Sequence, residues 1–405
     1  MFDAREEARA ITARINPDRL ADDLWALVNI PSPTGQERQA SLAFARMLAR
    51  AGAQVQLDER NPSSPTVIGR LQGTRPGKVF QLAGHIDHID VSHRPPKRTR
   101  EIISGRGSAD MKNGLAGILE IVRVLHECGC NFPGQVLVTV YGLHEAPIGD
   151  SASLLRLINE GTVGEAALVA ENVGPAEGQA VIMGKGQSIW TIRLAREGAP
   201  CHELCRPEGE DLLGACLAVA SVLHRRSREL SRRKGRFPLL GPESLFVGQV
   251  HYGDFYNRMP QHCTLQGTRR WLPRRTFGDV QQEMARLLAS VPLPPGISVE
   301  SDWTFVAESY QMAAKEPVVR AFKSAGQTVT GRHMKDTGIS AVVDGHRLVA
   351  LGRVPTVLCG FDNVTAHADL EFVRLEKLLD PCKIALLTTL NYLYESERRS
   401  SEERP

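Results

Sequence analysis

The sequence predicts an α/β protein in which a mostly parallel sheet, with helices on both faces, is interrupted by a smaller α+β unit. Three observations lead to this prediction. The chain has 405 residues, which is too long for one ordinary hydrophobic core and indicates two domains. Strand-like and helical patterns alternate in its first and last parts. The middle part has a different order of elements.

Helices and strands alternate in the first part of the chain. Apolar residues at a period of 3.6 predict helices, and short runs rich in β-branched residues predict strands. In chain order we predict helices at 19–29 and 34–52, strands at 66–71 and 78–87, a helix at 113–129, a strand at 134–142, a helix at 150–161 and a strand at 165–172. Such alternation is typical of a mostly parallel sheet with helices on its faces.

The pattern changes after Pro175 to a βαββαβ order, which is enough for a compact unit. Its predicted elements are a strand at 187–198, a helix at 209–230, strands at 243–254 and 263–272, a helix at 279–288 and a strand at 296–308. The α/β character then returns with a helix at 316–326, a strand at 354–360 and a long helix at 370–396. We therefore expect one domain made of 1–180 and 310–405, with 181–309 inserted into it.

The composition favours an ordinary soluble protein. Apolar residues make up 42% and charged residues 23%, and a net charge of +3 is too small to predict a nucleic-acid or membrane partner. The first residues are charged, without the apolar core of a signal peptide, so we predict a cytoplasmic protein. The eight cysteines form no CxxC pair, which favours reduced, mostly buried thiols. Cys201 and Cys205 flank His202 but fall short of a closed zinc site.

Polar side chains follow the predicted parallel strands where each strand ends. They are His85 and Asp87, His144 and Glu145, and Glu171, with Asp110 between the first two strands just before a helix. Ligands collect at this edge of an open α/β sheet, and several converging carboxylates need a cation to offset their charge. The mixed nitrogen and oxygen set suits two zinc ions that share one carboxylate. A loop immediately before the last helix adds His367, with Glu371 one turn further along.

These residues, in this order, resemble the di-zinc metallopeptidase and amidohydrolase family that contains carboxypeptidase G, aminoacylase, acetylornithine deacetylase and succinyl-diaminopimelate desuccinylase. The matching segments span nearly the whole chain and read "VNIPSPTGQE", "AGHIDHID", "GRGSADMKNGLAG", "ALVAENVG" and "AHADLE". The third is close to the most specific motif of the family. The resemblance implies a zinc-exopeptidase-like catalytic domain at 1–180 and 310–405, and a lid at 181–309 that also mediates homodimerisation.

The resemblance also implies how the residues divide between the two metal ions of each subunit. His85 and Glu171 would bind one zinc ion, Glu145 and His367 the other, and Asp110 would bridge them. Co²⁺ and Mn²⁺ are the alternatives to Zn²⁺.

Further residues acquire expected roles from the resemblance. Asp87 would fix the tautomer of the metal-binding imidazole of His85. In the lid, His202 would polarise the scissile carbonyl in the active site of a partner subunit. Asn257 and Arg270 would bind the substrate's carboxylate. Because Arg269 is adjacent to Arg270, the sequence does not decide which of the two arginines matches the family's position. The alternative for His202, Asn257 and Arg270 is that they are ordinary surface residues of the lid. His88, Asp90 and His93 have no counterpart role and are expected in a solvated loop rather than as extra ligands.

The sequence departs from the family at Leu143-His144-Glu145, where relatives have Asp-Glu-Glu and the first glutamate is the general base. Glu145 then matches the ligand and His144 occupies the base position. Histidine suits proton transfer near neutrality, because its unperturbed pKa is about 6.5. The alternatives are that His144 is a ligand or orienting group, with Glu145 reassigned, or that the reaction is not ordinary hydrolysis. A second departure is "HMKDTGISAVVDG", where Asp336 and Ser340 do not align with the usual Gly-Ser/Thr-Asp segment.

We therefore expect a metal-dependent amidohydrolase of the deacylase or dipeptidase type. It would cleave an N-acyl amino acid or a short peptide-like amide by means of a metal-activated water, with His144 in place of the usual glutamate. The alternatives are acyl transfer or another specialised reaction on the same scaffold, and a non-catalytic homologue that binds carboxylates. The acyl group and the amine side are left open, because a fold does not fix a substrate.

Overall fold

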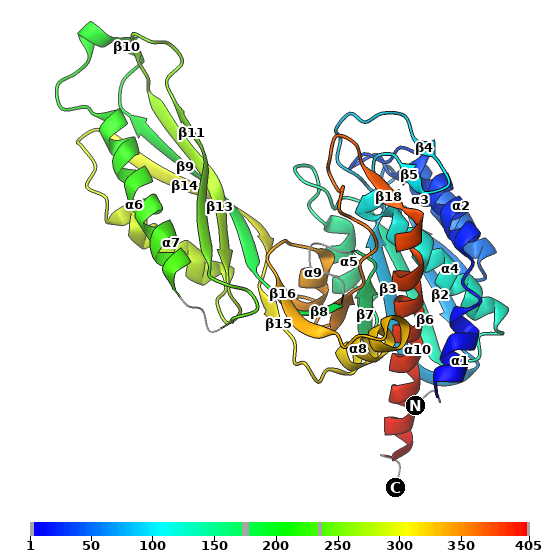
Figure 1. The fold of residues 1–405 in the computed structure, drawn as a ribbon. Helices are drawn as coiled ribbons and strands as arrows, with labels where there is room; N and C mark the ends of the chain where they lie inside the picture. The colour runs from blue at the N-terminus through cyan, green and yellow to red at the C-terminus, as the bar shows by residue number, and fades with distance from the viewer. Residues whose placement is uncertain (1–3, 172–177, 234–236, 403–405) are drawn as a thin grey trace. The chain divides into compact units, whose positions relative to one another are not determined.

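The computed structural model describes residues 4–171, 178–233 and 237–402. The chain forms two compact units (Figure 1). The main unit comprises Met1–Ile182, Met312–Thr337 and Val343–Pro405, and the inserted unit comprises Met183–Gln311 and Gly338–Val342. The chain leaves the main unit within β8 (Gln179–Gly184) and re-enters it after β15 (Tyr310–Gln311); β16 (Lys335–Ile339) joins the sheet of these two strands.

The main unit is built on a six-stranded sheet with the order β1-β2-β6-β3-β7-β17. The strands are β1 (Gln54–Asp58), β2 (Thr66–Gln72), β3 (Arg75–His85), β6 (Pro133–Tyr141), β7 (Ala166–Val169) and β17 (Thr356–Leu358). β3, β6, β7 and β17 pair in parallel, whereas β2 runs antiparallel to both of its neighbours. The predicted mostly parallel α/β sheet is thus confirmed, with β2 as its antiparallel exception.

The helices of the main unit are α1 (Ala4–Thr12), α2 (Pro17–Val28), α3 (Arg38–Arg50), α4 (Asn113–Glu127), α5 (Ala152–Asn159), α8 (Pro317–Thr330), α9 (Asp344–Ala350) and α10 (Leu379–Glu402). α4 and α10 pack against β3 and against each other, and α9 packs against β7 and β17. A Cβ atom on Gly114 would lie 1.9 Å from the carbonyl oxygen of Ala170. Only glycine therefore lets the start of α4 approach the end of β7 so closely.

The segment before the last helix differs from the prediction. Phe372–Arg374 forms β18, which pairs with β5 (Ile102–Ser104) beside β4 (Lys97–Arg98), and α10 begins only at Leu379, after the short helix η3 (Leu375–Lys377). The backbone of Phe372 is held by the hydroxyl of Thr365, and its aromatic ring and the β-branched Val373 favour a strand. The expected helix at 370–396 is therefore wrong in its first part, and Glu371 lies before β18 rather than on a helix.

The inserted unit has the predicted βαββαβ order. Its main elements are β9 (Gly186–Arg196), α6 (Leu212–Arg232), β11 (Ser244–Tyr252), β13 (His262–Trp271), α7 (Phe277–Ala289) and β14 (Ile297–Ala307). Its four strands form an antiparallel sheet with the order β11-β13-β9-β14. Alternate residues of β9, such as Trp190 and Ile192, are buried in one core with Leu223 of α6 and Met284 of α7. A smaller sheet pairs β10 (Cys201–His202), followed by the short helix η2 (Glu203–Cys205), with β12 (Arg258–Met259).

Cys216 of α6 and Cys263 of β13 are joined as a disulfide inside the core of the inserted unit. The expectation of reduced thiols is therefore wrong for these two residues. Across the described ranges of the chain, the structure contains no helix that is both long and apolar enough to cross a lipid bilayer.

Candidate metal centre

The polar residues at the ends of β3, β6 and β7 lie at one edge of the main sheet. β3 runs parallel to β6 with His85 opposite Tyr141, and it runs parallel to β7 with Ala83 opposite Val169. The side chains that follow these strand ends therefore share the carboxyl edge, as the sequence predicts.

The loop that presents Asp110 is bound by Glu371. The buried carboxylate of Glu371 accepts hydrogen bonds from the backbone N–H groups of Gly107 (3.1 Å), Ala109 (2.9 Å) and Asp110 (3.1 Å), and from Nη1 of Arg106 (3.0 Å). Gly107 has a φ of 81°, a left-handed conformation that favours glycine. The loop includes the turn η1 (Ser108–Lys112), whose backbone is not helical at Asp110 and Met111, and a cis peptide bond joins these two residues. Glu371 thus fixes the backbone from which the carboxylate of Asp110 projects.

Asp110 lies between two histidines. Its Oδ1 is 3.2 Å from Nε2 of His85, and its Oδ2 is 3.3 Å from Nε2 of His367. Nε2 of His367 is also 3.0 Å from Oε1 of Glu145. A carboxylate whose two oxygens face different partners has the arrangement that a bridging ligand needs.

The donor atoms around Asp110 are close enough to share cations. Those of His85, Asp110 and Glu145 all lie within 4.8 Å of one another, and so do those of His85, His144 and Glu171. Oε2 of Glu171 is buried and has no hydrogen-bond partner in the part of the chain that the structure describes. A buried, unpaired carboxylate oxygen among imidazoles and other carboxylates fits a divalent metal ion.

Electrostatics also indicate that this cluster attracts positive charge. Hydrogen bonds to Asp110 and Glu145 raise the pKa of His367 to about 10. Burial opposes ionisation of Asp110, but His367 and His85 outweigh it and hold its pKa far below the ordinary range. Burial raises the pKa of Glu171 to about 8, and the Asp110 carboxylate adds to this effect, although His144 opposes it. The cluster therefore favours bound cations, whether protons or metal ions.

Asp87 connects the ends of β3 and β6. Its Oδ1 is 3.5 Å from Nδ1 of His85, and its Oδ2 accepts hydrogen bonds of 2.9 Å from the backbone N–H groups of both His144 and Glu145. The hydroxyl of Thr34 donates a further hydrogen bond of 3.0 Å to Oδ2. Nδ1 of His85 lies closer to the carbonyl oxygen of Asp87, at 3.2 Å, so both the main chain and the carboxylate of Asp87 can orient this imidazole, while Oδ2 fixes the backbone of the next strand end.

His144 has two partners. Its ring stacks on that of His85, with centroids 3.9 Å apart and planes 3° from parallel. Its Nδ1 is 3.0 Å from Oδ1 of Asp344, a buried carboxylate at the start of α9. Burial opposes protonation of His144, but the charge of Asp344 outweighs it and raises the pKa of His144 to about 9.

Sequence analysis does not identify Asp344, although it singles out Asp336 and Ser340 nearby. Asp336 pairs with Lys323, and the carbonyl oxygen of Ser340 accepts a hydrogen bond from Arg270, so neither contacts His144. An aspartate at the start of a helix is ordinarily interpreted as a cap, so the sequence gives no sign of another role for Asp344. The useful signal is the histidine at position 144, because an imidazole at a buried site needs a partner for each nitrogen.

The segment of His88, Asp90 and His93 is only in part the solvated loop that the sequence predicts. Asp90 is exposed, but His88 is buried, and its Nε2 accepts a hydrogen bond from the backbone N–H of Ser32 (3.0 Å). Burial lowers the pKa of His88 to about 4. Nε2 of His93 accepts a hydrogen bond from the backbone N–H of Glu371 (2.8 Å). The two histidines therefore contact backbone beside the metal centre, and the expectation of a solvated loop is wrong for them.

Comparisons with known proteins agree with this fold and donor set. The sequence profile of peptidase family M20/M25/M40 matches residues 82–391 of the chain. The chain belongs to this family. As a member of a peptidase and amidohydrolase family, it is a hydrolase, which leaves the non-catalytic alternative without support.

Individual relatives of this M20 family protein are distant but cover almost all of it. It is 28% identical to an N-formyl-4-amino-5-aminomethyl-2-methylpyrimidine deformylase of Bacillus subtilis, over 88% of this chain and 90% of the relative. It is 23% identical to the protein of the same name from Halalkalibacterium halodurans, over 93% of this chain and 95% of the relative.

Two solved structures show the same fold. A tripeptidase from Staphylococcus aureus superposes with a TM-score of 0.76 at 18% identity, over 94% of this chain and 99% of the other. A dinuclear metal-binding peptidase of the M20 family from Bacillus subtilis superposes with a TM-score of 0.69 at 15% identity, again over 94% and 99%.

The remaining predicted site residues of this M20 family protein belong to the inserted unit. Exposed His202 lies on β10, with its Nε2 3.3 Å from Nδ2 of Asn257. Arg270 is partly buried and donates a hydrogen bond to the carbonyl oxygen of Ser340. Arg269, in contrast, is completely buried and pairs with carboxylates of its own unit. Of the two arginines, only Arg270 therefore presents an accessible guanidinium group.

Proposed function

We propose that this protein is a metal-dependent amidohydrolase that cleaves an N-acyl amino acid or a short peptide-like amide. One observation carries the proposal: the carboxylate of Asp110 lies between His85 and His367, with Glu145 and Glu171 beside them. Three carboxylates and two imidazoles at a sheet edge match the donor set of a two-metal hydrolase.

His85 and Glu171 would hold one metal ion and Glu145 and His367 the second, with Asp110 shared between them. We propose Zn²⁺, because this mixed set of nitrogen and oxygen donors suits it; Co²⁺ and Mn²⁺ are the alternatives. Bound metal ions of this kind polarise an amide carbonyl and make water a better nucleophile near neutral pH. Asp87 orients the imidazole of His85 and, through two backbone N–H groups, fixes the loop of His144 and Glu145.

His144 is the proposed general base, in the position where relatives have glutamate. With the two metal ions bound, their positive charge would offset that of Asp344 and keep the imidazole neutral, so that it could accept the proton of the attacking water and return it to the leaving amine. Two alternatives are set against this role: His144 binds a metal ion with His85 and Glu171, or the centre catalyses acyl transfer to form an amide. The stacking on His85 supports the first alternative, because it brings a nitrogen of His144 within 4.8 Å of donor atoms of His85 and Glu171.

A free carboxylate on the substrate is proposed to bind the inserted unit. Arg270 supplies an accessible guanidinium group, and Asn257 lies beside His202, the proposed group for polarising the scissile carbonyl. The two curated relatives are named as deformylases of an aminomethylpyrimidine. N-formyl amides of small aminomethyl heteroaromatics therefore belong in the substrate panel together with N-acyl amino acids and dipeptides.

The test begins with metal-free protein prepared with a chelator. Zn²⁺, Co²⁺ or Mn²⁺ is then added back, and release of a free amine is measured across the panel. We expect activity only with metal and about two metal ions per chain at saturation. Activity that persists after complete metal removal would overturn the proposal. Condensed product formed from an acyl donor and an amine, without release of acid, would identify the acyl-transfer alternative instead.

Variants at position 144 separate the roles of His144. If it is the base, His144→Ala loses about 100-fold or more in kcat but still binds two metal ions, and His144→Glu restores much of the rate. If it is a ligand, His144→Ala binds less metal. Full activity of His144→Ala on a confirmed substrate would rule out His144 as the general base.

We propose that a second copy of the chain pairs with the inserted unit along β11. β11 is one of the two edge strands of its sheet, the other being β14, and an exposed apolar edge strand ordinarily needs a partner. Val250 and Tyr252 face the side of the sheet that α6 covers, because they lie opposite Leu265 and Cys263 of the buried core. They are nevertheless 52% and 38% exposed.

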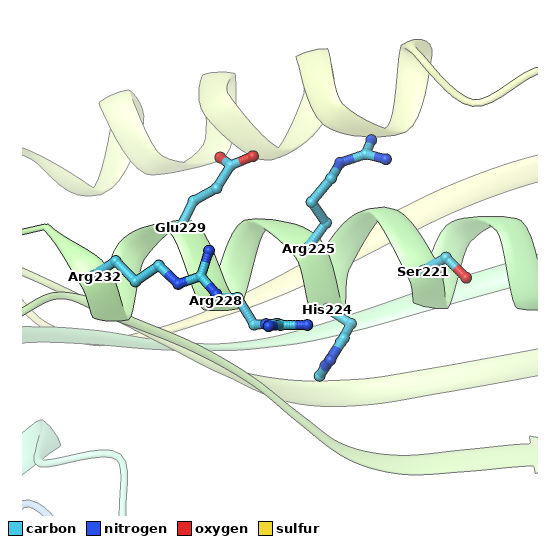
Figure 2. A pocket seen from close by; sticks show the side chains of 6 residues that line it. All are labelled: Ser221, His224, Arg225, Arg228, Glu229 and Arg232. Atoms are coloured by element: carbon cyan, nitrogen blue, oxygen red, sulfur yellow. The ribbon is translucent and has the colours of Figure 1, made fainter.

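The exposed face of α6 continues this surface. Leu213 and Leu217, one turn apart, are 45% and 58% exposed. Further along the helix, a cavity of about 430 Å³ is lined by Ser221, His224, Arg225, Arg228, Glu229 and Arg232 (Figure 2). In a two-fold, antiparallel contact between two α6 helices, this basic half would lie beside Glu208 and Asp211, which precede the other helix. The charges at the two ends of α6 therefore complement each other across such a contact.

Sedimentation tests the proposed dimer. We expect a dimer for the wild type and a monomer for Val250→Asp or Leu217→Asp, because a charge in an apolar interface is unfavourable. Leu351→Asp is the control, since Leu351 is also an exposed apolar residue, at 46%, but lies in the main unit. A monomeric wild type would contradict the proposal.

A further inference from the structure

The carboxylate of Asp344 is placed to act on one nitrogen of His144. Its Oδ1 lies 3.0 Å from Nδ1 of His144, and both residues belong to the main unit. Asp344 is completely buried, and the guanidinium group of Arg347 lies 3.8 Å from the same Oδ1. The backbone N–H of His144 is fixed by Asp87 (2.9 Å). His144 is therefore held at three points: its backbone N–H, the face of its ring that stacks on His85, and Nδ1.

The direction of the hydrogen bond follows from the charge of Asp344. Burial opposes its ionisation, but the imidazole of His144 and the guanidinium group of Arg347 outweigh burial and lower the pKa of Asp344. An ionised carboxylate can only accept hydrogen bonds. Nδ1 of His144 must then carry the proton that it donates, so in the neutral ring Nε2 bears the lone pair.

We propose that Asp344 is a positioning residue for His144: its carboxylate holds the imidazole through Nδ1–H and leaves Nε2 as the nitrogen that can accept a proton. This inference rests on the proposed function, in which His144 replaces a glutamate base. A glutamate has two equivalent oxygens and needs no such partner, whereas an imidazole has two different nitrogens and works in only one tautomer. The buried carboxylate of Asp344 selects the tautomer that a histidine at position 144 needs in order to act as a base.

The same geometry predicts an interdependence of positions 144 and 344. With glutamate at position 144, the two buried carboxylates would face each other and repel. Asp344 should therefore help catalysis only when histidine occupies position 144. An aspartate that merely stabilised the start of α9 would be needed equally in both backgrounds.

The first experiment is a double-mutant cycle on the metal-loaded protein. It compares the wild type, Asp344→Asn, His144→Glu and the double variant on one substrate. We expect Asp344→Asn to lower kcat about 100-fold with little change in KM in the wild-type background. In the His144→Glu background we expect no loss from Asp344→Asn, or a gain. Asp380→Asn, an exposed aspartate on α10, is the control. Equal losses in both backgrounds would overturn the proposal.

The second experiment needs no activity and uses zinc-loaded protein, because without metal ions the raised pKa of His144 would leave both ring nitrogens protonated near neutral pH. Protein labelled with ¹⁵N-histidine reports which ring nitrogen of each histidine carries a proton, and the signals of His144 are those absent from His144→Gln. We expect Nδ1–H in the wild type and population of the Nε2–H tautomer in Asp344→Asn. A wild-type His144 protonated only at Nε2 would overturn the proposal even if Asp344→Asn failed to fold.

The two experiments separate the failure of this inference from the failure of the proposed function. If the wild type hydrolyses no amide, the proposed function fails, and the tautomer measurement alone decides whether Asp344 pairs with Nδ1–H of His144. If the wild type hydrolyses an amide but Asp344→Asn leaves kcat and the tautomer unchanged, only the role of Asp344 is wrong.

Discussion

Nε2 of His367 lies 3.0 Å from Oε1 of Glu145, although 222 positions separate the two residues in the sequence. Glu145 follows a strand of the main sheet, whereas His367 lies in a loop beyond the inserted unit and adopts a left-handed backbone with a φ of 62°. This conformation is uncommon for a residue other than glycine and is ordinarily found where tertiary contacts require it. The contact between these two side chains defines the second half of the proposed metal centre.

His367→Ala is expected to bind about one metal ion per chain in place of two, because the ion shared with Glu145 loses its only imidazole. Activity should fall at least about 100-fold, since loss of a ligand costs no less than loss of a supporting contact. Elemental analysis of metal-reconstituted protein gives the stoichiometry. His333→Ala removes an exposed histidine and should change neither quantity. Two tightly bound ions in His367→Ala would contradict the ligand assignment.

Glu371→Gln is expected to weaken metal binding through the Asp110 loop. The amide oxygen can accept in place of one carboxylate oxygen, but the amide nitrogen cannot accept, so two of the four donors lose their acceptor together with the charge that pairs with Arg106. Metal affinity should fall by about 10- to 100-fold, as for other residues that support ligands. Loss of this buried pair should also lower stability by about 3 kcal/mol. Competition with a chelator measures the affinity, thermal unfolding measures stability, and exposed Glu376→Gln serves as the control. Unchanged metal affinity would mean that the loop keeps its conformation without Glu371.

Arg269 and Arg270 are adjacent but should respond differently to replacement. Arg270→Ala should raise KM for a substrate with a free carboxylate by about 10- to 100-fold, the value of a charged hydrogen bond, with little effect on folding. Arg269→Ala should destabilise the inserted unit by about 3 kcal/mol, because it removes the completely buried partner that Glu243 and Glu283 share and leaves them with the less buried Arg275 and Arg226. Steady-state kinetics and urea unfolding distinguish the two effects. A KM effect confined to Arg269→Ala would reverse the assignment.

The stability of the inserted unit should fall in acid because of Glu283. Burial opposes ionisation of Glu283, but Arg269, Arg226 and Arg275 outweigh it and lower its pKa to about 2. Since the folded-state pKa lies below the unfolded one, this network contributes stability above about pH 4.5 and loses it as the pH falls towards 2. The full contribution is on the order of 2–3 kcal/mol.

Urea unfolding of metal-free protein between pH 7 and pH 3 measures this contribution. In a Trp25→Phe background the remaining tryptophans, Trp190, Trp271 and Trp303, all report on the inserted unit. Glu283→Gln should be less stable at pH 7 and should depend less on pH below 5. Glu300→Gln, on the exposed side of β14, should keep the wild-type profile. An identical pH profile for Glu283→Gln would exclude Glu283 as the cause.

Hybrid dimers test the proposed role of His202. His85→Ala and His202→Ala should each be nearly inactive alone, the first for lack of a metal ligand and the second for lack of the carbonyl-polarising group. If His202 acts in the active site of a partner subunit, a mixture of the two variants should regain activity, because the His202→Ala subunit then receives an intact His202 from its partner. A mixture no more active than its components would contradict this role.

Much of the main unit could be predicted from the sequence, because its architecture depends on local patterns. Alternating runs such as 78–87 and 113–129 specify a strand and a helix through residues that are neighbours in the chain. The polar strand ends follow directly, since the carboxyl ends of parallel strands share one edge. His85, Glu145 and Glu171 could therefore be placed at one edge of the sheet without coordinates.

Features that depend on distant partners could not be predicted in this way. β18 replaces the start of the predicted last helix because the backbone of Phe372 pairs with a strand some 270 residues earlier. Asp344 is 200 positions from His144, and nothing around it indicates that its side chain points to the end of β6. His88 and His93 have polar neighbours in sequence, but their ring nitrogens are occupied by the backbone of Ser32 and Glu371. Such contacts form only in the tertiary structure.

The binding of the Asp110 loop by Glu371 has a consequence for biosynthesis. A chain still being made has completed β3, β6 and β7 long before residues 367–371 exist, so the sheet edge can form while the centre lacks both His367 and the support of its central loop. We therefore expect nascent chains that end before residue 367 to retain little metal, and the ions to be acquired only when translation is almost complete. A product that ends before residue 367 would also lack α10, which packs against β3 and α4, so it would have neither a complete core nor the complete metal centre.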